Sequence, residues 1–264
     1  MTNSMTLDLA AALDDLRVAA PPSVGFGALV AAGLADHYAP IDTPLGEAFV
    51  AWNGRGVSWV GMAEDGDAFE SRFRAGVGRP IARADAVPDR LAHAIQRRLD
   101  GDRRNTIPLD LRGHTPFEVM VWMKALEIPC GEVRPYSWIA AEIGKPKAVR
   151  AVGTALAHNP VPLVVPCHRV VRSDGMIGQY SMGGPAAKRR VLGAEGLDAS
   201  WLEAEAAAGR RFTGSDTTHI VCHPTCRDAR RVTDRHRVSF PSLRTAAAAG
   251  YRPCKHCRPV SLAA

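Results

Sequence analysis

Four of the six cysteines of this 264-residue chain follow Val221, and they form two closely spaced pairs. Three residues separate the first pair and two separate the second, and both spacings are typical of zinc ligands. The six thiols are too few and too unevenly distributed for a disulfide scaffold, which favours metal binding or catalysis. We therefore predict one Zn2+ site, with His223 and His256 as alternative ligands. The expected ligands are Cys222, Cys226, Cys254 and Cys257.

The segment between the two cysteine pairs is long enough to fold, and its pattern predicts a strand at 238–240 and a helix at about 242–249. The charge of this region is its second distinguishing feature. Residues 210–258 carry a net charge of +8, whereas the rest of the chain carries −2 of the total +6. A basic block beside paired cysteines indicates a polyanionic partner such as DNA, and a solvated basic face without a partner is the alternative.

Length and hydrophobicity predict more than one folded unit, because 264 residues with 46% hydrophobic content exceed an average domain. No run of eighteen apolar residues occurs, and residues 1–12 lack a basic leader or a small-residue cleavage site. We expect a cytoplasmic monomer that does not bind membranes.

The first half of the chain predicts a short leader, at 1–37, followed by a small α+β unit at 38–111. Two apolar runs, at 47–52 and 57–62, flank Asn53-Gly54-Arg55-Gly56, which is turn chemistry for a hairpin. The pattern further predicts a helix at 88–99 and a short strand at 105–111.

Residues 112–197 form the next predicted unit. Thr115-Pro116-Phe117-Glu118 predicts a capped helix start, with the helix running to about Glu127. Helices are predicted at 137–143 and 147–158, and the turn between them makes a helix-turn-helix arrangement. Small residues in the second helix would admit a phosphate backbone, and Arg150 would project as its long cation, although an ordinary packed helix fits equally well. The small residues are Ala148, Ala151, Gly153 and Ala155. A helical linker is expected at 198–211.

Cys167 is a candidate nucleophile at the end of a predicted extended run, 161–165. A lone internal cysteine is more often a small buried hydrophobe. The adjacent His168 could act as its base only through a bridging water or a bent backbone, because neighbouring side chains diverge.

The stretch from Thr115 to Gly196 resembles the 6-O-alkylguanine-DNA alkyltransferase family. The resemblance is carried by blocks in the family's order, including Ile128-Pro129-Cys130-Gly131-Glu132-Val133, Gly144-Lys145-Pro146, Pro166-Cys167-His168-Arg169-Val170-Val171, Gly178-Gln179-Tyr180-Ser181 and Glu195-Gly196. It implies an α+β fold in which a ribonuclease-H-like subdomain, more weakly matched at 38–111, precedes a winged-helix-like catalytic domain.

The resemblance also implies a role for each matching residue. Cys167 would accept a methyl group from 6-O-methylguanine, with 4-O-methylthymine as a further candidate lesion, and His168 would take the thiol proton through a water. Glu195 would balance the imidazolium, Tyr136 would protonate the departing guanine oxygen, and Asn159 would order the turn. Arg150 would fill the gap left by the flipped base. Further DNA contacts would come from Ala148, Ala151, Gly153 and Arg169, and the pocket from Tyr180 and Ser181. Cys130 is expected to be structural.

Residues 212–264 form the last predicted unit, and residues 212–259 within it resemble the Ada-type zinc-binding domain that repairs methylphosphotriesters. Matching features include Cys222-x-Pro224-x-Cys226 and Ala249-Gly250-Tyr251-Arg252-Pro253-Cys254-x-x-Cys257. Two departures stand out: the domain trails here although it leads in the adaptive-response protein, and no second helix-turn-helix of the activator type follows. Direct transcriptional activation is therefore not expected. The resemblance implies that Cys222 is both a zinc ligand and a second methyl acceptor, and a closed structural zinc site is the alternative.

The sequence thus predicts a single-turnover S-methyltransferase that acts on double-stranded DNA carrying alkyl lesions and uses no organic cofactor. Three alternatives remain: a damage sensor that flips bases without transfer, a DNA-binding regulator with a structural zinc tail, and a cysteine hydrolase. The last would need an oxyanion hole that the sequence does not reveal.

Overall fold

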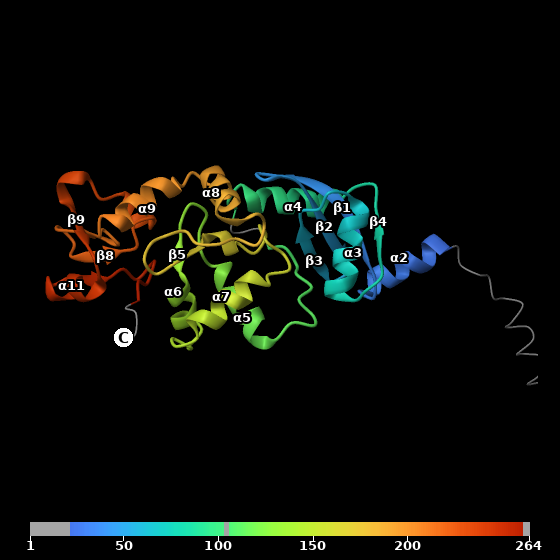
Figure 1. The fold of residues 1–264 in the computed structure, drawn as a ribbon, viewed down its shortest axis with the longest axis horizontal. Helices are drawn as coiled ribbons and strands as arrows, with labels where there is room; N and C mark the ends of the chain where they lie inside the picture. The colour runs from blue at the N-terminus through green and yellow to red at the C-terminus, as the bar shows by residue number, and fades with distance from the viewer. Residues whose placement is uncertain (1–21, 103–105, 261–264) are drawn as a thin grey trace, which may run out of the picture.

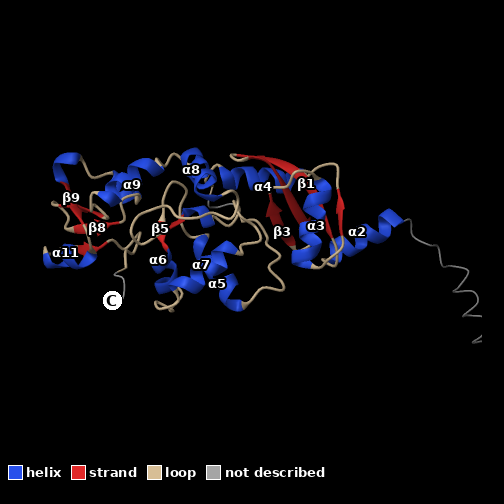
Figure 2. Cartoon of the chain, viewed as in Figure 1, coloured by secondary structure: helices blue, strands red, loops and turns tan. Residues whose placement is uncertain are grey.

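The computed structural model describes residues 22–102 and 106–260 as an elongated molecule with a sheet at each end and helices between them (Figure 1). Sheet and helices alternate along the chain, so the fold mixes α and β structure (Figure 2). Within the described ranges, no helix is long and apolar enough to cross a membrane.

The N-terminal unit is built on a four-stranded sheet in the order β3-β2-β1-β4. Its elements are α2 (Pro22–Ala32), β1 (Asp36–Thr43), β2 (Gly46–Asn53), β3 (Gly56–Gly61), α3 (Gly66–Val77), β4 (Ile81–Arg83) and α4 (Asp89–Leu99). The predicted hairpin is confirmed as the antiparallel pair β2–β3, and the predicted helix as α4. Neither α3 nor β1 was predicted from the sequence. Strand β1 begins inside the presumed leader, and residues 1–21 of that leader lie outside the described part.

The prediction of a strand at 105–111 is wrong, because residues 106–111 form no strand. Only one bridge forms, between Leu109 and Val57, while Asn105 lies outside the described residues. The segment runs so close to β3 that a Cβ on Gly56 would lie 2.3 Å from the carbonyl oxygen of Pro108. Only glycine fits at position 56. The two backbones therefore lie close together there without forming a regular ladder of hydrogen bonds.

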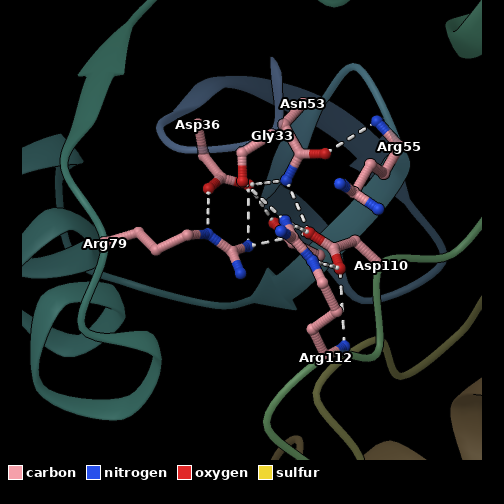
Figure 3. Close-up of polar contacts among 8 residues, drawn as sticks. Gly33, Asp36, Asn53, Arg55, Arg79, Asp110 and Arg112 are labelled. Carbon is pink, nitrogen blue, oxygen red and sulfur yellow. Dashed lines mark hydrogen bonds and ion pairs between the residues drawn. The ribbon is translucent and has the colours of Figure 1, made fainter. Parts of the chain in front are cut away.

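A buried polar network joins the N-terminal sheet to the segment that leads into the central helices (Figure 3). Asn53 Nδ2 donates to Asp36 Oδ1 at 2.9 Å and to Asp110 Oδ2 at 2.8 Å. Arg79 Nε donates to Asp36 at 2.7 Å, and Arg112 Nε donates to Asp110 at 2.7 Å. Two guanidinium groups therefore balance two buried carboxylates, as a network in a low dielectric requires.

The central unit consists of short helices, and its main apolar core continues into the N-terminal sheet, where it includes Val50 and Val57. Its elements are α5 (Pro116–Ala125), β5 (Arg134–Pro135), α6 (Tyr136–Glu142), α7 (Val149–Ala157), the 3-10 turn η1 (Cys167–Arg169), β6 (Val170–Val171) and α8 (Gly184–Ala194). The capping box predicted at the start of α5 is confirmed: Thr115 Oγ1 accepts from the Glu118 amide, and the Glu118 carboxylate accepts from the Thr115 amide. Both helices predicted around Gly144-Lys145-Pro146 are present as α6 and α7.

The extended run predicted at 161–165 is instead a tight turn. A bridge joins Pro162 to Val165, and Leu163 between them has the left-handed φ of 71°. Prolines at 160, 162 and 166 remove backbone donors, which leaves no ladder for a strand to join. The turn reverses the chain directly before Cys167.

The C-terminal unit contains a four-stranded sheet in the order β10-β8-β7-β9. Its elements are α9 (Ala199–Ala207), β7 (Phe212–Ser215), β8 (Ile220–Cys222), α10 (Arg227–Arg230), the 3-10 turn η2 (Asp234–His236), β9 (Arg237–Phe240), α11 (Leu243–Ala248) and β10 (Arg252–Pro253). The strand and helix predicted between the cysteine pairs are present as β9 and α11. The expected linker helix is α9, and its buried Leu202 packs with Val133, Val171 and Leu192 of the central unit. Helix α9 is therefore packed against the central unit and is not a free linker.

Candidate functional site

Cys167 lies at the first position of η1, where the preceding turn directs it into the protein; the residue is 6% exposed. The Asn159 side chain organises that turn, because its Oδ1 accepts from the Val161 amide at 3.1 Å and its Nδ2 donates to the Val165 carbonyl at 3.0 Å. The same Nδ2 lies 3.2 Å from Cys167 Sγ. Asn159 is thus both a turn residue and a hydrogen-bond donor to the sulfur.

His168 and Glu195 form a buried pair beside the thiol. His168 Nε2 lies 2.8 Å from Glu195 Oε1, and the Gly131 amide donates to Glu195 Oε2 at 3.1 Å. Within the described ranges, no donor or acceptor lies in hydrogen-bond reach of His168 Nδ1, although this atom is buried. A neutral imidazole that donates through Nε2 to Glu195 keeps its Nδ1 lone pair free to accept a proton.

Arg169 does not lie where the sequence analysis predicted. It was expected to contact DNA, yet it is 3% exposed and its guanidinium is bound to protein groups. Arg169 Nε and Nη2 donate to the Glu195 carboxylate at 2.7–3.0 Å, and Nη1 donates to the Ile128 carbonyl at 2.8 Å. Its role is to fix Glu195, because a bidentate guanidinium sets both the charge and the orientation of a carboxylate.

The pKa values of the site follow from burial and from these partners. Burial by itself would raise the pKa of Glu195, but hydrogen bonds and positive charge from His168 and Arg169 bring it down to about 2. Burial lowers the pKa of His168, with Glu195 opposing part of the effect, so the imidazole is neutral near pH 7. Burial raises the pKa of the Cys167 thiol, while the Asn159 hydrogen bond and a nearby lysine charge offset part of that rise. The resting site therefore holds a protonated thiol next to a neutral base.

The two predicted tyrosines lie close to Cys167. Tyr136, the first residue of α6, has its pKa raised by burial and by the Cys167 charge. The Tyr180 ring packs edge-on to the His168 ring at a centroid distance of 6.0 Å, and its hydroxyl donates to Met182 Sδ at 3.6 Å. Ser181, in contrast, is exposed.

Helix α7 presents the predicted DNA-facing residues unequally. Arg150 and Ala151 are exposed, whereas Ala148 and Gly153 are half-buried. A Cβ on Gly153 would lie 3.9 Å from the Tyr136 ring, which is an ordinary van der Waals contact, so Gly153 lies against that ring. Ala155, one of the predicted small contact residues, is 2% exposed and belongs to the core, which corrects its expected role.

Lys188 of α8 is a site residue that the sequence analysis missed. The side chain is fully buried and donates to the carbonyl oxygens of Val170 and Ile177, each at 2.6 Å, and of Gln179 at 3.2 Å. Burial lowers the pKa of Lys188 to about 8, and the Cys167 charge opposes this. The sequence did contain a signal that Lys188 is buried, because Lys188 shares the apolar face of α8 with Val191 and Leu192 at i+3 and i+4.

The four tail cysteines gather into one buried cluster, with all four sulfurs within 4.8 Å of one another. Sulfurs around a tetrahedral zinc are about 3.7 Å apart for a bond of about 2.3 Å, so the cluster fits Zn2+. Backbone amides of His223 and His256 donate to Cys257 Sγ and Cys254 Sγ at 3.4 and 3.3 Å, so both sulfurs accept hydrogen bonds within the cluster.

Neither histidine joins the cluster as a ligand. The His256 ring lies 3.2 Å from Asp228, and the His223 ring is buried against Phe212. Cys130 also lies outside the cluster: it is half-buried, and burial followed by the Glu195 charge raises its pKa.

Two known protein families match this chain, one over the region of Cys167 and one over the four-cysteine cluster. Residues 116–197 match the family "6-O-methylguanine DNA methyltransferase, DNA binding domain", and residues 199–260 match "Metal binding domain of Ada". The second match includes α9, which the sequence analysis had assigned to a linker.

Individual relatives are similar to more than half of the chain. The chain is 38% identical over 156 residues to the methylated-DNA–protein-cysteine methyltransferase of Mycobacterium tuberculosis, covering 59% of this chain and 90% of that one. It is 40% identical over 157 residues to the bifunctional transcriptional activator/DNA repair enzyme Ada of Escherichia coli, but it spans only 43% of that protein. The crystal structure of Mycobacterium tuberculosis OGT in complex with DNA matches at a TM-score of 0.50 and 31% identity, covering 63% of this chain and 98% of that chain.

Proposed function

The chain belongs to the methylated-DNA–protein-cysteine methyltransferase family, and from this premise we propose that it repairs DNA by moving a methyl group from 6-O-methylguanine to Sγ of Cys167. The observation that carries the proposal is the buried His168, which directly follows Cys167 in the chain: its Nε2 is held by Glu195, while its Nδ1 has no hydrogen-bond partner among the described residues. A damage sensor without transfer would have no use for this arrangement.

The transfer step balances with the residues at hand. The Cys167 proton passes through a water to His168 Nδ1, and Glu195 stabilises the resulting imidazolium. The thiolate then attacks the methyl carbon; an S–C bond forms, the C–O bond breaks, and its electron pair remains on the guanine oxygen. Tyr136 protonates that oxygen, and the imidazolium can return the proton to the phenolate. The products are guanine and a methyl thioether.

The thioether ends the activity of the molecule, because none of the groups in the site can displace a thiolate from a methyl carbon. Each molecule then repairs one lesion, which makes it a reagent more than a catalyst. The range of lesions follows from the chemistry: when the thiolate attacks a methyl on an exocyclic oxygen of guanine, or on the corresponding oxygen of thymine, the base departs as a stabilised anion.

DNA recognition is assigned to α6 and α7, which we interpret as a helix-turn-helix. The exposed Arg150 and Ala151 support this assignment, since a small residue lets the backbone of DNA approach and a long cation can enter the duplex. Arg150 would occupy the gap after base flipping, while Tyr180 and Ser181 would line the pocket. We propose a ribonuclease-H-like subdomain at 38–111, a winged-helix-like catalytic domain at 112–197, and a zinc domain that takes in α9 from the expected linker at 198–211 and continues to 264. Action on chromosomal DNA would put the protein in the cytoplasm of a bacterium.

The C-terminal unit binds DNA and, we propose, uses Cys222 as a second methyl acceptor. Bound zinc would keep the four sulfurs deprotonated and electron-rich. Cys222 Sγ would attack the methyl carbon of a phosphotriester, and the C–O electron pair would stay on the phosphate oxygen, restoring a diester anion. A methylated phosphate is neutral, so a negative sulfur can approach it without repulsion. A purely structural zinc site is the competing interpretation.

Intact mass after incubation with a duplex carrying 6-O-methylguanine tests the first transfer. We expect one added methylene on the protein, mapped to Cys167, and none in the matched Cys167→Ser variant, which should keep its DNA affinity because the hydroxyl preserves the shape of the side chain. Methylation that persists in Cys167→Ser would remove Cys167 from the reaction.

Peptide mapping after exposure to methylphosphotriester DNA free of methylguanine tests the second transfer. Methyl on Cys222 supports the reactive site. One equivalent of zinc with no methylated tail cysteine leaves only the structural role.

A further inference from the structure

The C-terminal unit docks onto the central unit through buried polar contacts to residues 131–133. The Thr225 hydroxyl accepts from the Val133 amide at 3.0 Å and donates to the Val133 carbonyl at 3.4 Å, with Thr225 only 1% exposed. The amide of Arg227 donates to Glu132 Oε1 at 3.1 Å. Thr225 and Arg227 flank the zinc ligand Cys226 on either side, so the metal-binding turn itself makes this contact.

The same short segment holds the acidic residue of the methyl-acceptor site. The amide of Gly131 donates to Glu195 Oε2, and Glu195 in turn binds His168. Gly131 has a left-handed φ of 68°, and a Cβ there would lie 3.0 Å from the Glu195 carbonyl oxygen and 3.5 Å from Nη1 of Arg230. The segment is thus confined between Glu195 on one side and the C-terminal unit on the other.

We propose that Thr225 is a positioning residue for methyl transfer at Cys167: through Val133 and Gly131, the metal-binding turn holds the Glu195 carboxylate where it orients His168. The inference rests on the proposed function of Cys167. Nothing of the C-terminal unit needs to reach the substrate, because the effect passes through backbone contacts that are desolvated and therefore geometrically strict. The zinc unit acts as a support for the first methyl-acceptor site as well as a binder of DNA.

The experiment uses the full-length, zinc-loaded chain in single-turnover assays with a methylguanine duplex. Thr225→Val keeps the shape of the side chain but leaves the Val133 amide without its acceptor, while the Val133 carbonyl keeps only its Arg134 donor, and we expect the limiting rate of transfer to fall about fivefold or more. DNA affinity and zinc content should not change. Thr225→Ser restores the hydroxyl and should restore the rate. Thr233→Val is the matched control, since Thr233 is exposed and its side chain makes no capping hydrogen bond.

A Thr225→Val protein that is folded, zinc-loaded and as fast as the unmutated chain would overturn the inference, and so would a rate loss matched by the Thr233→Val control. If the unmutated chain fails to accept methyl, the proposed function itself fails, which the same assay reveals separately. Hydrogen exchange of the unmutated chain tests the contact even if Thr225→Val does not fold. Removal of zinc with a chelator should speed exchange of the 130–134 amides but not of those in β1–β3, and unchanged exchange at 130–134 would refute the coupling.

Discussion

At the scale of single residues, the reactivity of Cys167 is set by what surrounds its sulfur. Burial holds the thiol protonated, while the Asn159 amide and the Lys188 ammonium favour the thiolate. Lys188 is a buried cation whose three hydrogen bonds all go to backbone carbonyls, so no carboxylate cancels its charge in those contacts. An ammonium held in this way can stabilise an anion that develops nearby.

We predict that Lys188→Met slows methyl transfer at neutral pH. Removing the cation raises the Cys167 pKa, and each unit of that rise costs about tenfold in the thiolate population. Single-turnover rates from about pH 6 to about pH 9 would show the rising limb of the rate profile displaced to higher pH. Lys124→Met, which removes a half-buried lysine of α5 that is paired with Glu127, is the control. A uniformly lower rate with no displacement would assign Lys188 a packing role only.

At the scale of elements, the two faces of α7 have opposite tasks. The helix exposes Arg150 and Ala151 while burying Val152, Ala155 and Leu156, so one face can meet DNA and the other secures the core. Trp122 of α5 fixes the helix by donating from Nε1 to the Ala155 carbonyl at 2.8 Å. The arginine is thereby mounted on a rigid element, as insertion into a duplex requires.

We predict that Arg150→Ala slows repair of duplex DNA more than repair of single-stranded DNA, because only a duplex leaves a gap in its base stack when the lesion flips out. Parallel rate measurements on the two substrates check this. Arg74→Ala, which removes an exposed arginine from α3 in the N-terminal unit, should change neither rate. Equal slowing on both substrates would reduce Arg150 to a general phosphate contact.

A second element-level prediction concerns the end of β2. Asn53→Leu would remove the amide that bridges the buried Asp36 and Asp110 (Figure 3). Two carboxylates would lose a shared donor in a desolvated site, and we expect the free energy of unfolding to fall by about 2 to 4 kcal/mol. Urea denaturation gives the value. A loss below about 0.5 kcal/mol would mean that the two arginines suffice.

At the scale of the whole molecule, two carboxylates link stability to pH. The pKa of Asp110 and that of Glu195 are each about 2, against ordinary values of 3.8 and 4.5. Burial opposes both shifts, while hydrogen bonds to Arg112, Asn53, His168 and Arg169 outweigh it. Because folding lowers these pKa values, the unfolded chain binds more protons, and the stabilisation present above about pH 4.5 is lost as the pH falls toward 2.

We predict that Glu195→Gln is less stable than the unmutated protein at neutral pH, by about 3 kcal/mol, and that this difference shrinks as the pH falls below about 4.5. The variant is less stable because Arg169 would be left buried without the carboxylate that it binds in the unmutated protein. Urea denaturation of both proteins at several pH values measures the difference directly, and zinc release affects both alike. A difference that stays constant through the acid range would contradict the link.

Local sequence was sufficient for the features that depend on neighbouring residues. The capping box at Thr115, the hairpin turn at Asn53 and the cysteine pairs all follow from chemistry within a few residues, so the helix start, the hairpin and the metal cluster could be predicted. The α+β character followed in the same way. The strand at 105–111 and the extended run at 161–165 failed because an apolar stretch near prolines looks extended whether or not a ladder partner exists.

By itself, the sequence determined which groups can react: a cysteine beside a histidine, and four thiols at metal spacing. Only the tertiary structure decided what each group faces. Arg169 became a buried partner of Glu195 instead of a DNA contact, and Lys188 became a cation near the thiol. The 131–133 segment came to join the zinc unit to Glu195. The reason is physical, because desolvation and hydrogen-bond partners depend on residues far away in the chain, and these set both the charge and the orientation of a side chain.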